Sequence, residues 1–390
     1  MRLPPLFGYG FRPFFLAAGL TATLLIPWWV ASFALSVPLP TAWPATLWHG
    51  HEMVFGFIVA ALSGFLLTAV PSWTGQRGFA GWPLVLVTTL WLLGRLLVAS
   101  SIHWPPLLTA AMDVAFLPVL ALLLLPPLLR AHNRNARLLV ALIALSAVNA
   151  LFHWALAHGD IAAAHRALIV AIDIVLLLVT VIGGRIVPAF TASALKSQGV
   201  VLAVKNSHGI TALAIAVMVT VVVVDITLPD TRIAGACALV AAVVHAVRLA
   251  QWGGRKALRQ PLVSILHVAY AWLPVGFALK ALSLLAGMPF AAFWLHALTI
   301  GAAATMIMAV ITRASLGHTG RPLVADSRTV LAYTCLTAAA VVRIAGPALP
   351  AVPYVAVLGL SGLLWTAAFV IFLWVYAPIL LTPRADGKAG

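Results

Sequence analysis

Long runs of apolar residues dominate the chain, and they lack the two-residue alternation of strands that face water on one side. Residues 168–181 and 210–224 are examples of such unbroken runs. A bilayer core of about 30 Å is crossed by about 20 apolar residues in a helix, and only helices or closed barrels satisfy every backbone group there. The pattern therefore predicts an all-α integral membrane protein.

The apolar runs between Pro, Gly and basic residues predict a bundle of about twelve transmembrane helices. No connection between the runs is long enough for a soluble domain, so we predict one polytopic transmembrane domain over residues 1–390. The expected spans are 14–36, 47–70, 82–100, 105–129, 137–157, 166–188, 208–227, 232–252, 262–286, 291–313, 328–346 and 352–377.

Composition agrees with lipid as the solvent, because 63% of the residues are hydrophobic, 8% are charged and the mean hydropathy is +1.10. The formal net charge of +15 does not indicate nucleic-acid binding, because the basic residues are scattered between apolar runs. They concentrate in the connections after the even-numbered spans, so the positive-inside rule predicts that both termini are cytoplasmic. These residues are Arg77, Arg130, Arg134, Arg137, Lys196, Lys205, Arg255, Lys256, Arg259, Arg321 and Arg328.

Histidines inside the spans divide into two layers on this topology. An ionisable residue near the bilayer centre costs about 3 kcal/mol, so each is a functional candidate by default. Two layers suit two redox centres, or one centre and a ligand path, whereas the alternative is that each histidine is a hydrogen-bonded packing residue. Imidazole is a common ligand of copper and iron. The outer layer holds His49, His51, His153 and His296, and the inner layer holds His208, His245, His267 and His318.

The densest candidate site is the segment 48–53, Trp-His-Gly-His-Glu-Met. On a regular helix His49 and Glu52 share a face, whereas His49 and His51 point about 200° apart. Both histidines can reach one metal only where the segment is not yet helical. Otherwise, one binds the metal and the other serves a neighbour.

A stripe of small residues continues this segment at four-residue spacing, with Gly56, Ala60 and Gly64. Its usual meaning is close packing of one helix on another. A flat porphyrin lying against the helix is the alternative.

Carboxylates accompany the outer histidines. Glu52, the only glutamate of the chain, shares the outer half with Asp113, Asp173, Asn149 and His153, and Arg95 lies in the same half. Buried carboxyl groups can deliver protons, so Glu52 and Asp173 are the candidate catalytic residues. A structural ion pair with Arg95 is the competing interpretation.

Several of these segments also carry a resemblance to the NnrS family of nitric-oxide-response membrane proteins. The similar segments occur in order from the first span to just after the tenth, and several are long enough to be specific. They are residues 10–15, 48–53, 64–75, 183–191, 261–276, 296–301 and 313–321.

The resemblance implies twelve spans, bound haem and copper, and a role in bacterial resistance to nitric oxide. At the family's histidine motifs stand His49, His51, His153, His267, His296 and His318. We expect haem b, because the chain has no Cys-x-x-Cys-His attachment motif. The expected metal ligands are His49, His51, His153 and His296, and the expected haem-binding residues are His245, Arg248, His267, Arg313 and His318.

Three functions compete. The first is an oxidoreductase in the bacterial inner membrane that reduces nitric oxide to nitrous oxide, with electrons from a donor such as a quinol. The second is a haem protein that binds nitric oxide without turnover, for protection or sensing. The third is a transporter of metal or haem, for which broken helices at mid-membrane are expected.

Overall fold

The computed structural model describes residues 3–200 and 204–387 of the chain. Within these residues the regular structure is all helical, without a strand, and twelve helical segments are long and apolar enough to cross a membrane. The predicted fold class is therefore confirmed. The segments are α1 (Phe11–Leu35), α2–η2–α3 (Ala45–Thr74), α4 (Trp82–Ala99), α5 (Pro106–Arg130), η4–α6 (Arg134–Ala157), α7 (Ile161–Ser197), α8 (His208–Thr227), α9 (Arg232–Ala250), α10 (Pro261–Ala286), η6–α11–η7–α12 (Pro289–His318), α13–η8 (Ser327–Ala348) and α14 (Tyr354–Leu381).

Most predicted boundaries agree with these helices within a few residues, and the sixth span differs most. It was expected over 166–188, but α7 comprises 37 residues. At 1.5 Å per residue the helix is about 55 Å long, well beyond the apolar thickness of a bilayer. The polar residues around Arg166 and the proline at position 188 ended the predicted span, whereas the helix continues through both.

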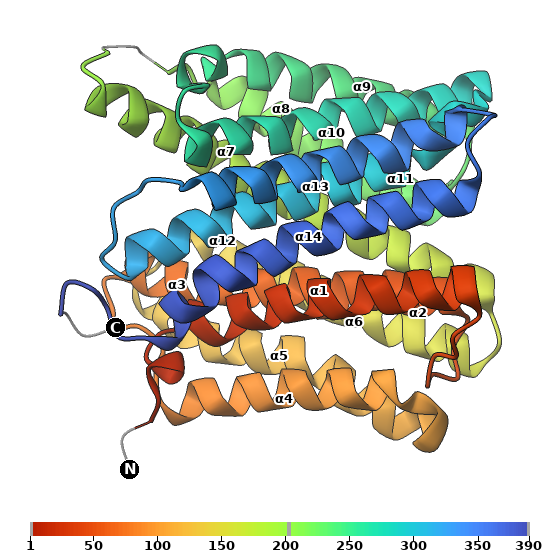
Figure 1. Cartoon of the computed structure of the whole chain (residues 1–390), viewed down its shortest axis with the longest axis horizontal. Coiled ribbons are helices and arrows are strands. Elements are labelled where there is room, and N and C mark those ends of the chain that lie inside the picture. The colour runs from red at the N-terminus through yellow and green to blue at the C-terminus, as the bar shows by residue number, and fades with distance from the viewer. Residues whose placement is uncertain (1–2, 201–203, 388–390) are drawn as a thin grey trace. The chain divides into compact units, whose positions relative to one another are not determined.

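The helices form two compact units. The first comprises the chain up to Ala171, Arg313–Leu323 and the chain from Phe369 onward, and in it α1 packs on α3 while α4, α5 and α6 pack in sequence. The second comprises Ile172–Thr312 and Val324–Ala368, where α9 packs on both α8 and α10 (Figure 1). Each unit is built from apolar helices, and the prediction of one transmembrane domain stays a prediction.

Two spans contain a π-helical segment. The second span passes from α2 (Ala45–His51) through η2 (Glu52–Ile58) into α3 (Val59–Thr74), and the tenth contains η7 (Ala297–Ala304). A π-helical segment widens the turn and changes the direction in which side chains point, and such segments are frequent at functional sites. Both begin next to a histidine, His51 or His296.

The prolines at 27, 118 and 274 lie within the continuous helices α1, α5 and α10. None of these three helices is broken at its proline, so they do not show the mid-membrane breaks expected of a transporter.

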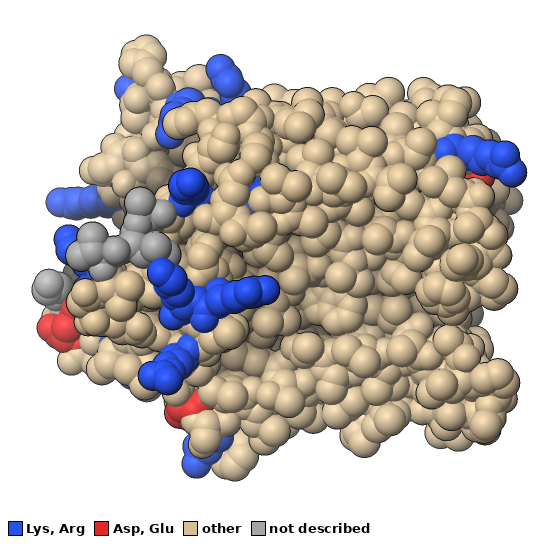
Figure 2. Space-filling model, turned by 90° about the horizontal axis from the view of Figure 1, so that it is seen from above, with Lys and Arg blue, Asp and Glu red and all other residues tan. Residues whose placement is uncertain are grey.

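The outer surface is as apolar as a bilayer requires. Leu24, Leu86 and Val140 are 62%, 65% and 70% exposed, although leucine and valine are usually buried in soluble proteins. Figure 2 shows a face on which large areas carry no charged side chain. The protein is therefore a multi-pass membrane protein.

The small-residue stripe faces α1. A Cβ atom at Gly64 would lie 2.8 Å from the ring of Phe15, and one at Gly56 would lie 3.2 Å from the side chain of Thr21. Ala60 is fully buried. The stripe therefore allows close packing of two helices, in agreement with the first interpretation.

Candidate metal centre

A cluster of six buried polar side chains lies in the first unit. None is more than 8% exposed, although the helices that carry them are otherwise apolar. The cluster contains His51 at the end of α2, Glu52 at the start of η2, Arg95 on α4, Asp113 on α5, and Asn149 and His153 on α6.

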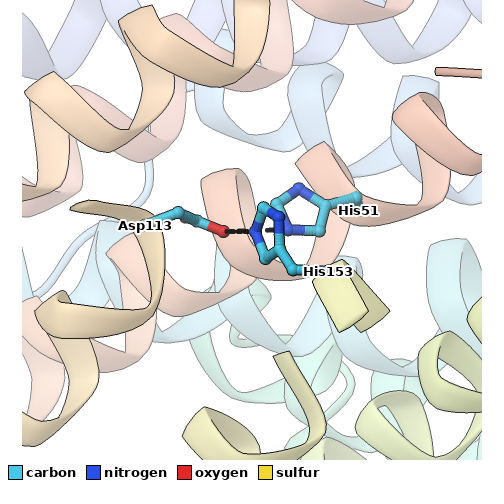
Figure 3. A group of neighbouring side chains, drawn as sticks. All are labelled: His51, Asp113 and His153. Atoms are coloured by element: carbon cyan, nitrogen blue, oxygen red, sulfur yellow. Dashed lines mark hydrogen bonds and ion pairs between the residues drawn. The ribbon is translucent and has the colours of Figure 1, made fainter. Parts of the chain in front are cut away.

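The carboxylate of Asp113 is the centre of this cluster. Its Oδ2 lies 3.0 Å from Nε2 of His51 and 2.8 Å from Nε2 of His153, and it accepts a hydrogen bond of 2.8 Å from Nδ2 of Asn149. Figure 3 shows the two imidazole rings meeting at the Asp113 carboxylate. Helices α2 and α6 thus bring three nitrogen atoms to one oxygen atom on α5.

Arg95 and Glu52 complete the cluster. Arg95 donates from Nη1 to Oε1 of Glu52 at 2.5 Å and forms an ion pair through Nη2 with Asp113. The same Oε1 of Glu52 lies 3.1 Å from Nδ1 of His51. The structural ion pair with Arg95 is therefore present, and it also joins Glu52 to His51.

The charges of the cluster do not cancel when its histidines are neutral. Glu52 and Asp113 contribute two negative charges, and Arg95 contributes one positive charge. An uncompensated charge is costly in a membrane interior. A cation between the imidazoles and the Asp113 carboxylate would offset the excess.

The geometry also fits a transition-metal ion. The ligand atoms of His51, Asp113 and His153 all lie within 4.8 Å of one another. Metal bonds of about 2.0–2.1 Å place neighbouring ligand atoms about 3 Å apart, close to the two distances at Asp113. Two imidazoles and one carboxylate suit iron, copper or zinc, so the donor set fits the expected copper without selecting it. Metal-binding histidines usually donate their second N–H to a carboxylate, as Nδ1 of His51 can to Glu52.

A small cavity adjoins the cluster. It has a volume of about 10 Å³ and is lined by Arg95, Asp113 and Asn149 together with apolar side chains such as Phe55 and Trp91. That volume is about what a single water molecule needs. The cavity therefore has room at the edge of the cluster for one molecule of about the size of water.

The structure separates the two histidines of segment 48–53. Helix α2 begins at Ala45, so the segment is helical throughout. His51 joins the cluster, whereas His49 stacks on Trp29 with ring centroids 4.2 Å apart. The two rings therefore lie in different surroundings, and metal binding by either histidine stays a prediction. Glu52, the first residue of η2, contacts His51 through Oε1.

His296, the fourth expected ligand, belongs to the second unit. It ends α11 (Trp294–His296), and its ring centroid lies 6.4 Å from that of Phe293. Its participation in the metal centre stays a prediction.

Asp173 lies in a different group of charges, in the second unit. It is buried on α7 beside Asp225 of α8, which forms an ion pair with Lys280 of α10. Neighbouring buried carboxyl groups are costly to ionise together, so one of such a pair can carry a proton. This agrees with a proton-carrying role for Asp173, which stays a prediction. Asp225 and Lys280 were not identified from the sequence. The signal that would have found them is Lys280, a charged residue inside the apolar run 261–286.

The second unit also brings together His245 and Arg248, which were both expected to bind haem, at the hydroxyl group of Tyr270. His245 and Arg248 lie on α9, and both contact the Tyr270 hydroxyl group, at 2.9 Å from Nδ1 and 3.0 Å from Nη1. Nε2 of His245 is buried without a hydrogen-bond partner among the described residues. A histidine held through one nitrogen with the other free fits an axial haem ligand. His267, one turn before Tyr270, instead bonds to Thr191 through Nε2 at 2.8 Å.

His318 and Arg313 belong to the first unit, unlike His245 and His267. The ring of His318 stacks on that of Tyr9, with the ring centroids 6.0 Å apart. The backbone carbonyl oxygen of His318 accepts a hydrogen bond from Arg384. Burial raises the pKa of Tyr9, which lies just before the first span. A haem site shared by His318 and the other predicted residues stays a prediction.

Comparison with known proteins agrees with the sequence motifs. The model of the NnrS protein family matches residues 5–384, nearly the whole chain. The search of curated proteins found no match to the chain. The match includes the last two spans, which the sequence motifs did not cover. The chain therefore belongs to the NnrS family.

Proposed function

We propose that this protein reduces nitric oxide to nitrous oxide at a metal ion held by His51, Asp113 and His153. Membership of the NnrS family indicates a role in the response to nitric oxide. The observation that carries the proposal is the buried cluster, which offers two imidazoles and a carboxylate around one point and has an excess negative charge. The proposed cofactors are copper and haem b, and the proposed location is the bacterial inner membrane.

The reaction consumes two nitric oxide molecules, two electrons and two protons, and it yields one nitrous oxide and one water. A metal ion bound there would supply a coordination position for nitric oxide and a source of electrons for its reduction. Nitric oxide is small, neutral and soluble in lipid, so a centre inside the membrane is accessible without a water-filled pore. The cavity of about 10 Å³ beside Asp113 and Arg95 is of the right order for such a molecule.

The side chains around the proposed metal have distinct roles. Glu52 can accept a hydrogen bond from the Nδ1–H group of His51, so Nε2, on the side of Asp113, is the nitrogen that would hold the metal. Arg95 holds both carboxylates in place. Because Glu52 is buried and hydrogen-bonded beside the centre, we also propose that its carboxylate takes up a proton during turnover and passes it to the reduced product.

Haem b is proposed near His245, on the support of its free Nε2 and the nearby positive charge of Arg248. An absorption spectrum of the purified protein tests this part. A bis- or mono-histidine haem spectrum that is lost in His245→Ala is expected, and a colourless preparation from haem-replete cells contradicts it.

The experiment that tests the function is turnover of nitric oxide by purified protein with an artificial reductant. We expect nitrous oxide, with loss of product in Asp113→Ala and in His153→Ala. A haem spectrum that changes on nitric oxide addition without nitrous oxide formation instead supports non-catalytic binding. Metal uptake into vesicles, without either result, supports transport.

A further inference from the structure

A much larger cavity lies in the first unit, between the start of α5 and the end of α6. Its volume is about 810 Å³, and its wall is mostly apolar. Leu107, Trp154 and Ile161 line it and are 81%, 55% and 47% exposed, so apolar side chains surround the opening. In a membrane protein such an opening admits molecules that dissolve in lipid.

His153 connects this cavity with the candidate metal centre. The residue lines the cavity, and its Nε2 lies 2.8 Å from Oδ2 of Asp113. Its other ring nitrogen, Nδ1, has no hydrogen-bond partner among the described residues. One imidazole therefore borders the cavity on one side and contacts the centre on the other.

The lining limits what the cavity can bind. It includes no Lys or Arg, which would be needed to pair with haem propionates. An acyl chain would make no use of the His153 ring. The volume falls within the range of pockets that bind small molecules, and the polar residues Ser101, Thr109 and His153 could orient a polar ring.

We propose that this cavity binds a quinol, with its ring at His153 and its tail toward the lipid. This inference rests on the proposed function, which needs an electron donor. A quinol hydroxyl group can both donate and accept, so it can bond to Nδ1 of His153 in either tautomer. The cavity is therefore the electron-input site beside the metal centre.

The chemistry balances. Oxidation of a quinol to a quinone breaks two O–H bonds and releases two electrons and two protons. Reduction of two nitric oxide molecules to nitrous oxide and water consumes the same number of each. The quinol is oxidised and nitric oxide is reduced, without any further co-reactant.

Photolabelling of the purified full-length protein with an azido-quinone tests the proposal, with peptide mapping as the readout. We expect label on residues 106–114 and 150–161, and competition by unlabelled quinone. The labelling requires neither nitric oxide nor turnover, so its failure is distinct from failure of the proposed function. Turnover with an artificial reductant but no labelling here would reject the quinol site alone.

Two substitutions fill the cavity, and one matched substitution does not. Ala150 and Ala157 line the cavity on α6, whereas Ala147 is exposed one turn earlier on the same helix and does not line it. We expect Ala150→Phe and Ala157→Phe to lose the label and Ala147→Phe to keep it, with metal content and unfolding temperature reporting that each variant is folded.

Three outcomes would overturn the proposal. The first is label confined to other peptides, and the second is wild-type labelling in both Ala150→Phe and Ala157→Phe. The third is displacement of the label by a fatty acid as effectively as by quinone, which would identify the cavity as a lipid site.

Discussion

Replacement of Glu52 by glutamine tests how the cluster holds its metal. The glutamine side chain would keep nearly the same size and could still accept a hydrogen bond from Nδ1 of His51. The substitution would remove one of the two negative charges that Arg95 contacts. The charge of the cluster with neutral histidines would then rise from minus one to zero, so a bound cation would be less strongly favoured.

The size of the effect follows from the position of Glu52. Its Oε1 lies 3.1 Å from Nδ1 of His51, the nitrogen opposite the one that faces Asp113. Loss of a carboxylate that orients a metal-binding histidine typically lowers metal affinity about 10–100-fold, which corresponds to about 1.4–2.8 kcal/mol. Turnover should also fall at saturating metal if Glu52 supplies protons, with a changed dependence on pH.

The assay is metal titration of the purified protein against a competing chelator, followed by nitric oxide turnover at saturating metal. Asp160→Asn is the matched control, because Asp160 is exposed and asparagine can still accept its hydrogen bond from the Ala163 amide. Wild-type affinity and wild-type turnover in Glu52→Gln would refute both roles of the carboxylate. Wild-type affinity with lost turnover would leave only the role in proton supply.

Three further comparisons, each of a substitution with a second variant, probe the rest of the account. His51→Ala should lose the bound metal and His49→Ala should keep it, as elemental analysis can measure, because only the first ring lies in the cluster. Lys280→Met should destabilise the second unit by about 3–5 kcal/mol, because it leaves the buried carboxylate of Asp225 without its cation. Neutralising Asp225 as well should restore most of the unfolding temperature. Gly64→Val should lower the unfolding temperature by an amount equivalent to about 1–3 kcal/mol through overpacking against α1, whereas Gly359→Val, with open space around it, should change it less.

The span pattern was predictable because the membrane imposes it on each helix separately. Apolar runs of about twenty residues specify where a helix crosses, and the twelve predicted spans all correspond to helices of the structure. The extra length of α7 was not predictable, because its ends continue with residues that also suit a loop.

The candidate site could be predicted in its residue types but not in its pairings. The cost of ionisable residues in lipid selected Glu52 and His153 from the sequence, whereas Asp113 was named only as a neighbour in the outer half and Asp173 was chosen instead. The position of His51 in the cluster, with His49 against Trp29, depends on which helices face each side of α2, and a local pattern does not predict that packing.

The rings of His51 and His153 meet at Asp113 because of how α2, α5 and α6 pack, which the sequence does not specify locally. Partners from different helices, such as Asp225 and Lys280, likewise become visible only in the folded chain.

The most direct test of the account is X-ray absorption spectroscopy of the purified protein at the edge of its bound non-haem metal. We predict two imidazole nitrogens and one carboxylate oxygen at about 2.0–2.1 Å, with one imidazole or the metal itself lost in each of His51→Ala and His153→Ala. An unchanged set of imidazole ligands in both variants would contradict a metal centre at this cluster.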